Sequence, residues 1–121
     1  MWDKNILAAI DAADDLHIAP LHPDGATHGT PTWIWSVVVD GRLYVRAWNG
    51  PRGKWYRAAI APKAGMIRAA GSDFNVRFEP ADAALTPAIS AAYESKYAGS
   101  SYLPPMVAEG PASACVEILP A

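Results

Sequence analysis

The chain has 121 residues, of which 51% are hydrophobic and 18% are charged, and its formal net charge at pH 7 is −2. This length and balance are typical of a soluble globular protein and exclude a disordered or fibrous segment, so we expect one domain over residues 1–121. Ten Lys and Arg against twelve Asp and Glu give no basic face, which argues against a nucleic-acid partner.

The cysteine count and the N-terminal stretch indicate a compartment. A single cysteine, Cys115, excludes an intrachain disulfide and a cysteine-based metal site, and it is typical of a reducing environment. The stretch "MWDKNILAAIDAADDLHI" carries acidic residues and no long apolar run, so we expect neither a signal peptide nor a membrane span. The sequence therefore predicts a cytoplasmic protein with no membrane partner.

The first predicted elements are a helix and a short strand. Apolar residues recur at helical spacing over residues 2–13, with Asp3 as the candidate N-cap and a stop at Asp14 and Asp15. A short strand is predicted over residues 16–19. Several Pro and Gly residues then mark a loop that ends at Pro31.

The strongest local pattern is "TWIWSVVVDGRLYVRAW", two β-branched and aromatic runs joined by Asp40-Gly41, which predicts a hairpin with a type I′ turn. Strand alternation then divides the side chains between two faces. One face holds bulky or charged side chains, namely Trp33, Trp35, Val37, Val39, Arg42, Tyr44, Arg46 and Trp48. The other face holds smaller ones that suit a tight barrel interior, namely Ile34, Ser36, Val38, Leu43, Val45 and Ala47.

Two interpretations of the bulky face stay open at this point. Its aromatic rings could form a stacking platform for a planar ligand, with Arg46 as a charge partner. Alternatively, a packed helix or a dimer interface covers this face, because Trp, Tyr and Arg are enriched at interfaces.

The second half of the chain predicts two further helices and three strands. A helix is expected over residues 51–61, with Pro51 at its first position. Strands in "GMIRAAG" and "FNVRFEP" are separated by Gly71-Ser72-Asp73. The stretch "LTPAISAAYESKYAG" predicts a helix with Thr86 as cap and Gly99 as its end, followed by a loop in "SSYLPPM" and a last strand in "ACVEIL". Six mainly antiparallel strands with flanking short helices indicate a small α+β barrel.

Several of these stretches resemble a known family. "HGTPTWIWSVVVDGRLYVRAWNGPRGKWYRAAI", "VRFEP" and "AAYESKYAGSSYLPPM" are similar to a small bacterial family of uncharacterised proteins in the FMN-binding split β-barrel superfamily, related to pyridoxamine-phosphate-oxidase-like and deazaflavin-dependent nitroreductase-like proteins. The most specific pieces are Trp55-Tyr56 and the Ala-Tyr-x-x-Lys-Tyr run over residues 92–97. The resemblance implies a split β-barrel homodimer that binds FMN or a deazaflavin in a groove at the dimer interface.

The expected cofactor contacts gather around the start of the second helix. Arg52 and Lys54 fall in its first turn, where they either bind a phosphate together with free backbone N–H groups or are simply solvated. The candidate cofactor-binding residues are Arg46, Trp48, Asn49, Arg52, Lys54, Trp55 and Tyr56.

No catalytic or metal-binding residue is assigned from the sequence. His17, His22 and His28 lie near Asp15 and Asp24, but their spacing matches no metal motif, so solvated or turn-stabilising histidines are the expectation. Ser100, Ser101 and Cys115 carry no nucleophile signature.

Two function hypotheses follow. The first is a flavin- or deazaflavin-binding protein that acts as an oxidoreductase on a small organic substrate, which the basic helix start favours. The second is a non-catalytic dimer that has lost the cofactor and binds a small apolar ligand or a protein partner. The stretch "DGATHGTP", which has no Lys or Arg to hold a phosphate, favours the second.

Overall fold

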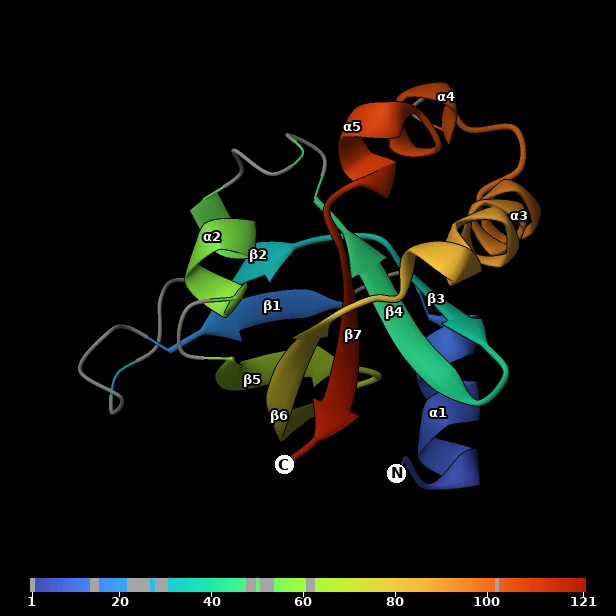
Figure 1. Ribbon diagram of the computed structural model, residues 1–121. Coiled ribbons are helices and arrows are strands. Elements are labelled where there is room, and N and C mark those ends of the chain that lie inside the picture. The colour runs from blue at the N-terminus through green and yellow to red at the C-terminus, as the bar shows by residue number, and fades with distance from the viewer. Residues whose placement is uncertain are drawn as a thin grey trace.

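A curled antiparallel sheet forms the body of the protein. The structure, a computed structural model, describes residues 2–13, 16–21, 27, 31–47, 50, 54–60, 63–101 and 103–121. Seven strands lie in the order β2-β1-β5-β6-β7-β4-β3, and the sheet curls into a half-barrel (Figure 1). The strands are β1 (His17–Pro20), β2 (Thr32–Trp33), β3 (Ser36–Val39), β4 (Arg42–Arg46), β5 (Ala64–Ala69), β6 (Ser72–Pro80) and β7 (Cys115–Pro120).

Short helices flank the sheet, so the predicted α+β class is confirmed. They are α1 (Lys4–Ala12), α2 (Lys54–Ile60), α3 (Thr86–Lys96), α4 (Leu103–Met106), α5 (Glu109–Ala112) and the 3₁₀ helix η2 (Ala83–Leu85). The predicted N-cap of α1 is confirmed, because Asp3 Oδ1 accepts hydrogen bonds from the N–H groups of Asn5 and Ile6 at 2.9 and 3.1 Å. Among the described helices, none combines the length and the apolar composition needed to cross a membrane.

The predicted hairpin is confirmed at its centre and wrong at one end. Asp40 and Gly41 both have positive φ, as a type I′ turn requires, and the expected pairs from Val39–Arg42 to Ser36–Val45 form. Trp33, however, pairs with His17 of β1 instead of continuing the hairpin. The strand breaks after Trp33, and β2 and β3 come to lie at the two opposite edges of the sheet order. Two consecutive segments thus bring the edges of the curled sheet toward each other, and the strand count is seven where six were expected.

Three other local predictions need correction. The turn between β5 and β6 is Ala70-Gly71, both with positive φ, and Ser72 and Asp73 already belong to β6. Thr86 is the first residue of α3 and makes no capping bond, because the preceding η2, capped by Asp82, leads directly into the helix. The predicted loop before the last strand contains α4, since two prolines near a helix start cost little where N–H groups have no partner anyway.

The concave side of the sheet holds an apolar core, called here the inner core. Its buried residues come from α1, α2 and six strands or their flanks: Leu7, Ile10, Leu16, Ile18, Ile34, Leu43, Val45, Ala59, Ile67, Ala69, Val76, Phe78, Val116 and Ile118. The small hairpin face predicted to fill a barrel lies here. Gly65 of β5 is needed at the tight curl, because a Cβ there would lie 2.6 Å from the Ala19 carbonyl oxygen.

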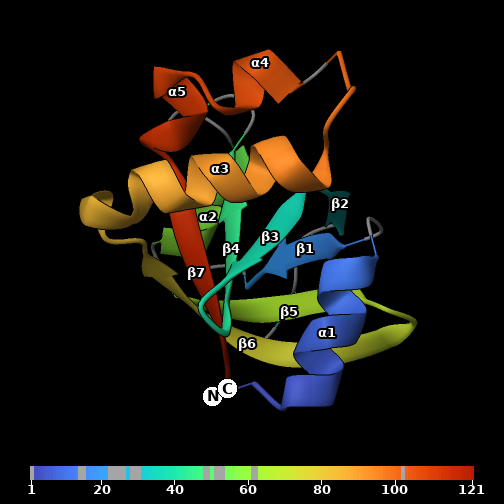
Figure 2. The ribbon, with the colours of Figure 1, turned by 90° about the vertical axis from the view of Figure 1, so that its right-hand side faces the viewer.

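The opposite side of the hairpin is covered by α3 and α4 and forms a second cluster, called here the outer core. Its buried residues are Val37, Tyr44, Ile89, Tyr93 and Met106, with Trp35, Val39 and Tyr97 among those packed against them. Figure 2 shows α3 lying across β7, β4 and β3, with α1 on the other side of β3. Of the two interpretations of the bulky face, the packed helix is therefore confirmed for the part from Trp35 to Arg46.

Candidate functional site

Arg46, expected to face a ligand, lies inside the outer core. Only 1% of its surface is exposed. Its Nη1 donates to the Met106 carbonyl oxygen at 3.3 Å and its Nη2 to the Thr86 carbonyl oxygen at 3.2 Å, so it links β4 to the start of α3 and to α4. Its Cζ lies 5.3 Å from the centroid of the Tyr93 ring, and its Nε has no hydrogen-bond partner among the described residues. The guanidinium is thus engaged with backbone carbonyls and an aromatic ring.

The aromatic rings beside Arg46 are also used for packing. Trp35 stacks on Tyr97 with ring centroids 3.9 Å apart and planes within 4° of parallel. Tyr93 donates its hydroxyl to the Trp35 carbonyl oxygen at 3.3 Å, and burial raises the pKa of this hydroxyl well above its ordinary range. These contacts fill the space in which a planar ligand would stack. Trp33 lies apart from them on β2, where 54% of its surface is exposed.

The other candidate residues follow β4 along the chain. Helix α2 begins at Lys54 and contains Trp55 and Tyr56, while Trp48, Asn49 and Arg52 lie outside the described residues. Tyr56 is partly buried and packs against the inner core. Arg46 and Tyr56 therefore pack in different cores.

The thiol of Cys115 is not activated as a nucleophile. Burial raises the pKa of the Cys115 thiol from 9.0 to about 11, and the neighbouring Arg46 guanidinium opposes this rise only in part. The thiol is therefore protonated at neutral pH. Among the described residues no group of three or more His, Cys, Asp or Glu could hold a metal ion, although His22, His28 and their acidic neighbours lie outside them.

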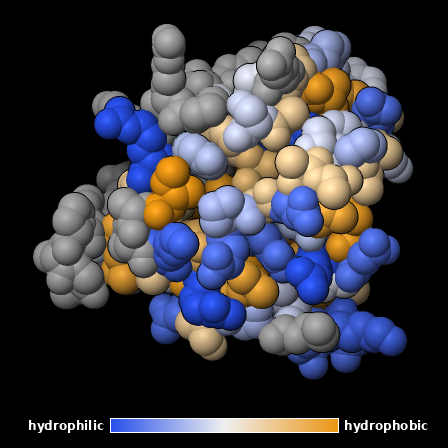
Figure 3. Space-filling model, in the orientation of Figure 1, coloured by the Kyte–Doolittle hydropathy of each residue, from blue (hydrophilic) through white to orange (hydrophobic). Residues whose placement is uncertain are grey.

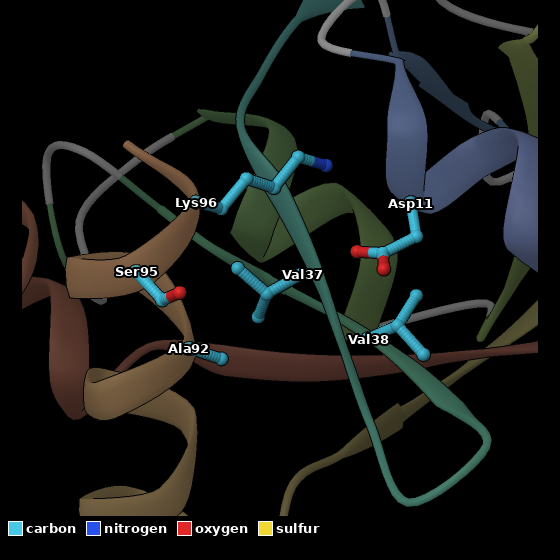
Figure 4. A pocket seen from close by; sticks show the side chains of 6 residues that line it. All are labelled: Asp11, Val37, Val38, Ala92, Ser95 and Lys96. Carbon is cyan, nitrogen blue, oxygen red and sulfur yellow. The ribbon is translucent and has the colours of Figure 1, made fainter. Parts of the chain in front are cut away.

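A groove that the sequence did not predict opens between α1 and α3, at the edge of the sheet formed by β3. Figure 4 shows its lining from both helices and the strand: Asp11, Val37, Val38, Ala92, Ser95 and Lys96. Its volume is about 320 Å³, near the lower limit for small-molecule pockets. We call it the β3-edge groove. The carboxylate of Asp11 and the ammonium of Lys96 approach it from opposite walls (Figure 4).

The last side chain of α3, Lys96, and that of the following residue, Tyr97, already contact the edge of β3 at one end of the groove. Lys96 Nζ donates to the Ser36 carbonyl oxygen at 2.8 Å, and the Tyr97 hydroxyl donates to the same oxygen at 3.1 Å. The Ser36 N–H in turn donates to the Tyr97 hydroxyl at 3.0 Å. Asp11 and Lys96 lie 85 positions apart in the sequence, and hydrophobic periodicity carries no signal that would place them together.

Among the described residues on the face of the molecule seen in Figure 1, no second candidate site stands out beside the β3-edge groove. In the space-filling view of Figure 3, hydrophilic side chains are interspersed with hydrophobic ones over this face. Such mixing is ordinary for a protein surface and marks no particular partner.

Comparisons with known proteins agree with the fold. Residues 6–118 match the model of a family described as "Uncharacterized protein conserved in bacteria (DUF2255)". No curated protein matches the chain. The structure is similar to the crystal structure of conserved hypothetical protein Rv2991 from Mycobacterium tuberculosis, with a TM-score of 0.64 and 15% sequence identity, over 98% of this chain and 78% of that one. At this identity the likeness shows the fold alone.

Proposed function

We propose that this chain, which belongs to the DUF2255 family, binds a phosphorylated flavin, either FMN or a deazaflavin, as a homodimer and acts as an oxidoreductase on a small organic substrate. The observation that carries the proposal is the curled antiparallel half-barrel, which is roughly the architecture implied by the family resemblance of the sequence. Because one fold hosts many functions, a direct binding measurement is the test of this proposal.

The residues present fit the cofactor at one place and not at another. The outer core does not fit it, because Arg46 is enclosed and the neighbouring rings stack on one another. The segment around the start of α2 fits it in composition, since Lys54, Trp55 and Tyr56 follow one another there. We therefore assign the phosphate to Lys54 and Arg52 and the ring system to the adjacent aromatic residues, with Arg46 holding β4 against α3. A bound flavin supplies the hydride chemistry, and the protein orients it.

The test is a titration of the purified protein with FMN and with a deazaflavin, followed by tryptophan fluorescence. We expect saturable quenching, and we expect Arg52→Ala/Lys54→Ala to weaken FMN binding by about tenfold or more because two charge-assisted hydrogen bonds are lost. Riboflavin, which lacks the phosphate, should bind both proteins equally. The matched control is Lys4→Ala/Arg77→Ala, which removes the same charge from exposed positions on α1 and β6.

Two results would refute the proposal. One is the absence of quenching by either cofactor, and the other is equal FMN affinity in the wild type and the Arg52→Ala/Lys54→Ala variant.

The second candidate function is binding of a partner by a barrel that holds no cofactor. The observation that favours it is the closure of the bulky hairpin face by α3, which removes Arg46 from the set of surface charges. Absence of flavin quenching together with a stable fold would support this candidate.

A further inference from the structure

The edge of β3 that faces away from β4 has a defined hydrogen-bonding pattern. In a two-residue type I′ hairpin the residues flanking the turn exchange hydrogen bonds, so Val39 and Val37 direct their N–H and C=O groups toward β4. Ser36 and Val38 then direct theirs away from the sheet. Ser36 shows this outward direction, because its N–H and C=O groups form hydrogen bonds with Lys96 and Tyr97.

Val38 is the outward-facing residue whose backbone lies in the β3-edge groove. It pairs with Leu43 at a position where an antiparallel ladder has no hydrogen bonds, so its N–H and C=O point into the groove. Proteins commonly protect such edges with charged side chains or a covering element. Here Lys96 and Tyr97 cover the outward backbone groups of Ser36 but form no hydrogen bond with those of Val38, the next residue that points outward.

The two walls of the groove carry opposite charges on opposite faces of the sheet. Helix α1 packs on the face of Val38, as part of the inner core, and presents Asp11. Helix α3 packs on the face of Val37, as part of the outer core, and presents Ser95 and Lys96. Asp11 is exposed and makes no ion pair within the described part of the chain.

We infer that the β3-edge groove binds an extended peptide segment of another protein, which adds to β3 as an antiparallel strand and pairs with the backbone of Val38. Directly opposed residues share a face of the sheet, so the peptide residue opposite Val38 faces Asp11 and is Lys or Arg. The next peptide residue lies opposite Val37, faces Lys96 and is Asp or Glu. The motif is thus a basic residue followed by an acidic one within an otherwise uncharged strand. This inference is independent of the flavin proposal.

Charge disfavours a second copy of the chain as the antiparallel partner. A twofold axis normal to the sheet would place Asp11 beside the Asp11 of the second copy and Lys96 beside its Lys96. Like charges at both walls oppose this arrangement, whereas one peptide strand with charges of both signs is complementary in charge to both walls.

The experiment uses two blocked hexapeptides of identical composition. The probe is acetyl-Thr-Val-Lys-Glu-Val-Thr-amide, and its control, acetyl-Thr-Val-Glu-Lys-Val-Thr-amide, exchanges the two charges. NMR titration of the isotope-labelled full chain follows the amide signals of Ser36 and Val38. We expect the probe to shift the Val38 amide and to bind about tenfold tighter than the control, because two attractive pairs become two repulsive ones. N-methylation of the probe's lysine amide should abolish binding, since it removes a hydrogen bond to Val38.

A charge reversal on the exposed wall completes the test. We expect Asp11→Lys to weaken binding of the probe by about fivefold and to improve binding of the exchanged peptide, because the attraction moves to the other sequence. Glu94→Lys makes the same change of charge at an exposed position of α3 outside the groove and should alter neither affinity. Equal binding of the two peptides, or no Val38 shift at about 1 mM probe, would overturn the inference. So would a dimer that protects the Val38 amide without peptide.

Discussion

The inner and outer cores are built from the same hairpin, yet they are held together in different ways. The inner core receives the small face of the hairpin and consists of aliphatic residues, alanines and Phe78. The outer core receives the bulky face and contains hydrogen bonds from Arg46 and Tyr93 to backbone carbonyls. Strand alternation alone produces this division, since successive side chains point to opposite faces.

The difference predicts which substitutions each core tolerates. An apolar core tolerates changes that conserve volume, because its energy depends on buried area and packing. A core with buried polar groups depends on each partner, because a carbonyl that loses its donor pays the cost of desolvation without compensation. We therefore expect volume to govern the inner core and hydrogen bonding to govern the outer one.

The largest effect is expected from a cavity in the inner core. Phe78 is fully buried, so Phe78→Ala should lower the free energy of unfolding by about 3–5 kcal/mol. Phe74, which is only partly buried and makes an edge-to-face contact with Trp2 at 5.5 Å, provides the matched control. Urea unfolding measures both. If Phe74→Ala cost as much as Phe78→Ala, buried volume would not be the governing quantity.

A smaller effect is expected from the buried guanidinium of the outer core. Arg46→Met keeps an apolar stem but leaves the carbonyl groups of Thr86 and Met106 without their donors, so it should cost about 2–4 kcal/mol in urea unfolding. The same substitution at the exposed Arg77 should change the stability by less than about 0.5 kcal/mol. An Arg46→Met protein as stable as the wild type would show that apolar packing alone suffices in this core. Some buried ion pairs in other proteins can likewise be replaced by apolar residues without loss of stability.

Local patterns predicted the hairpin and the α1 cap because both depend on residues close in sequence. Asp40-Gly41 fixes a turn whose twist matches the strands, and Asp3 caps its own helix. The pairing of Trp33 with His17 could not be predicted in this way, because it depends on how far the whole sheet curls. The role of Arg46 was missed for a related reason: its acceptors belong to α3 and α4, 40 and 60 positions further along the chain.

The β3-edge groove could not be predicted from local sequence patterns either. Alternation identified Val37 and Val38 as neighbours on opposite faces, but only the sheet order places β3 at an edge. The two helices that wall the groove, α1 and α3, lie far apart in the sequence, so their charges meet only in the folded protein. Residues brought together by topology carry no local pattern.

The smallest effect within an accessible pH range is expected from titration of Cys115, which packs against the outer core. The pKa of the Cys115 thiol is raised from 9.0 to about 11 in the folded protein, so the folded state holds its proton more tightly than the unfolded state does. The contribution of this group to stability is therefore complete below pH 9 and is lost as the pH rises toward 11. A shift of this size corresponds to a loss of about 3 kcal/mol once the pH exceeds both values, and about half of it is lost by about pH 10.

Comparison with Cys115→Ala removes the thiol and leaves most other groups that titrate in the same range unchanged. The pKa of Tyr93 is raised by burial and, to a smaller extent, by the charge of the ionised Cys115 thiol, so the difference between the two proteins reports the thiol together with its coupling to Tyr93. Urea unfolding at a series of pH values above about 8 should show the wild type losing stability more steeply than Cys115→Ala. Parallel curves would mean that the thiol ionises as easily in the folded as in the unfolded chain, and that water and the Arg46 guanidinium together compensate fully for its burial.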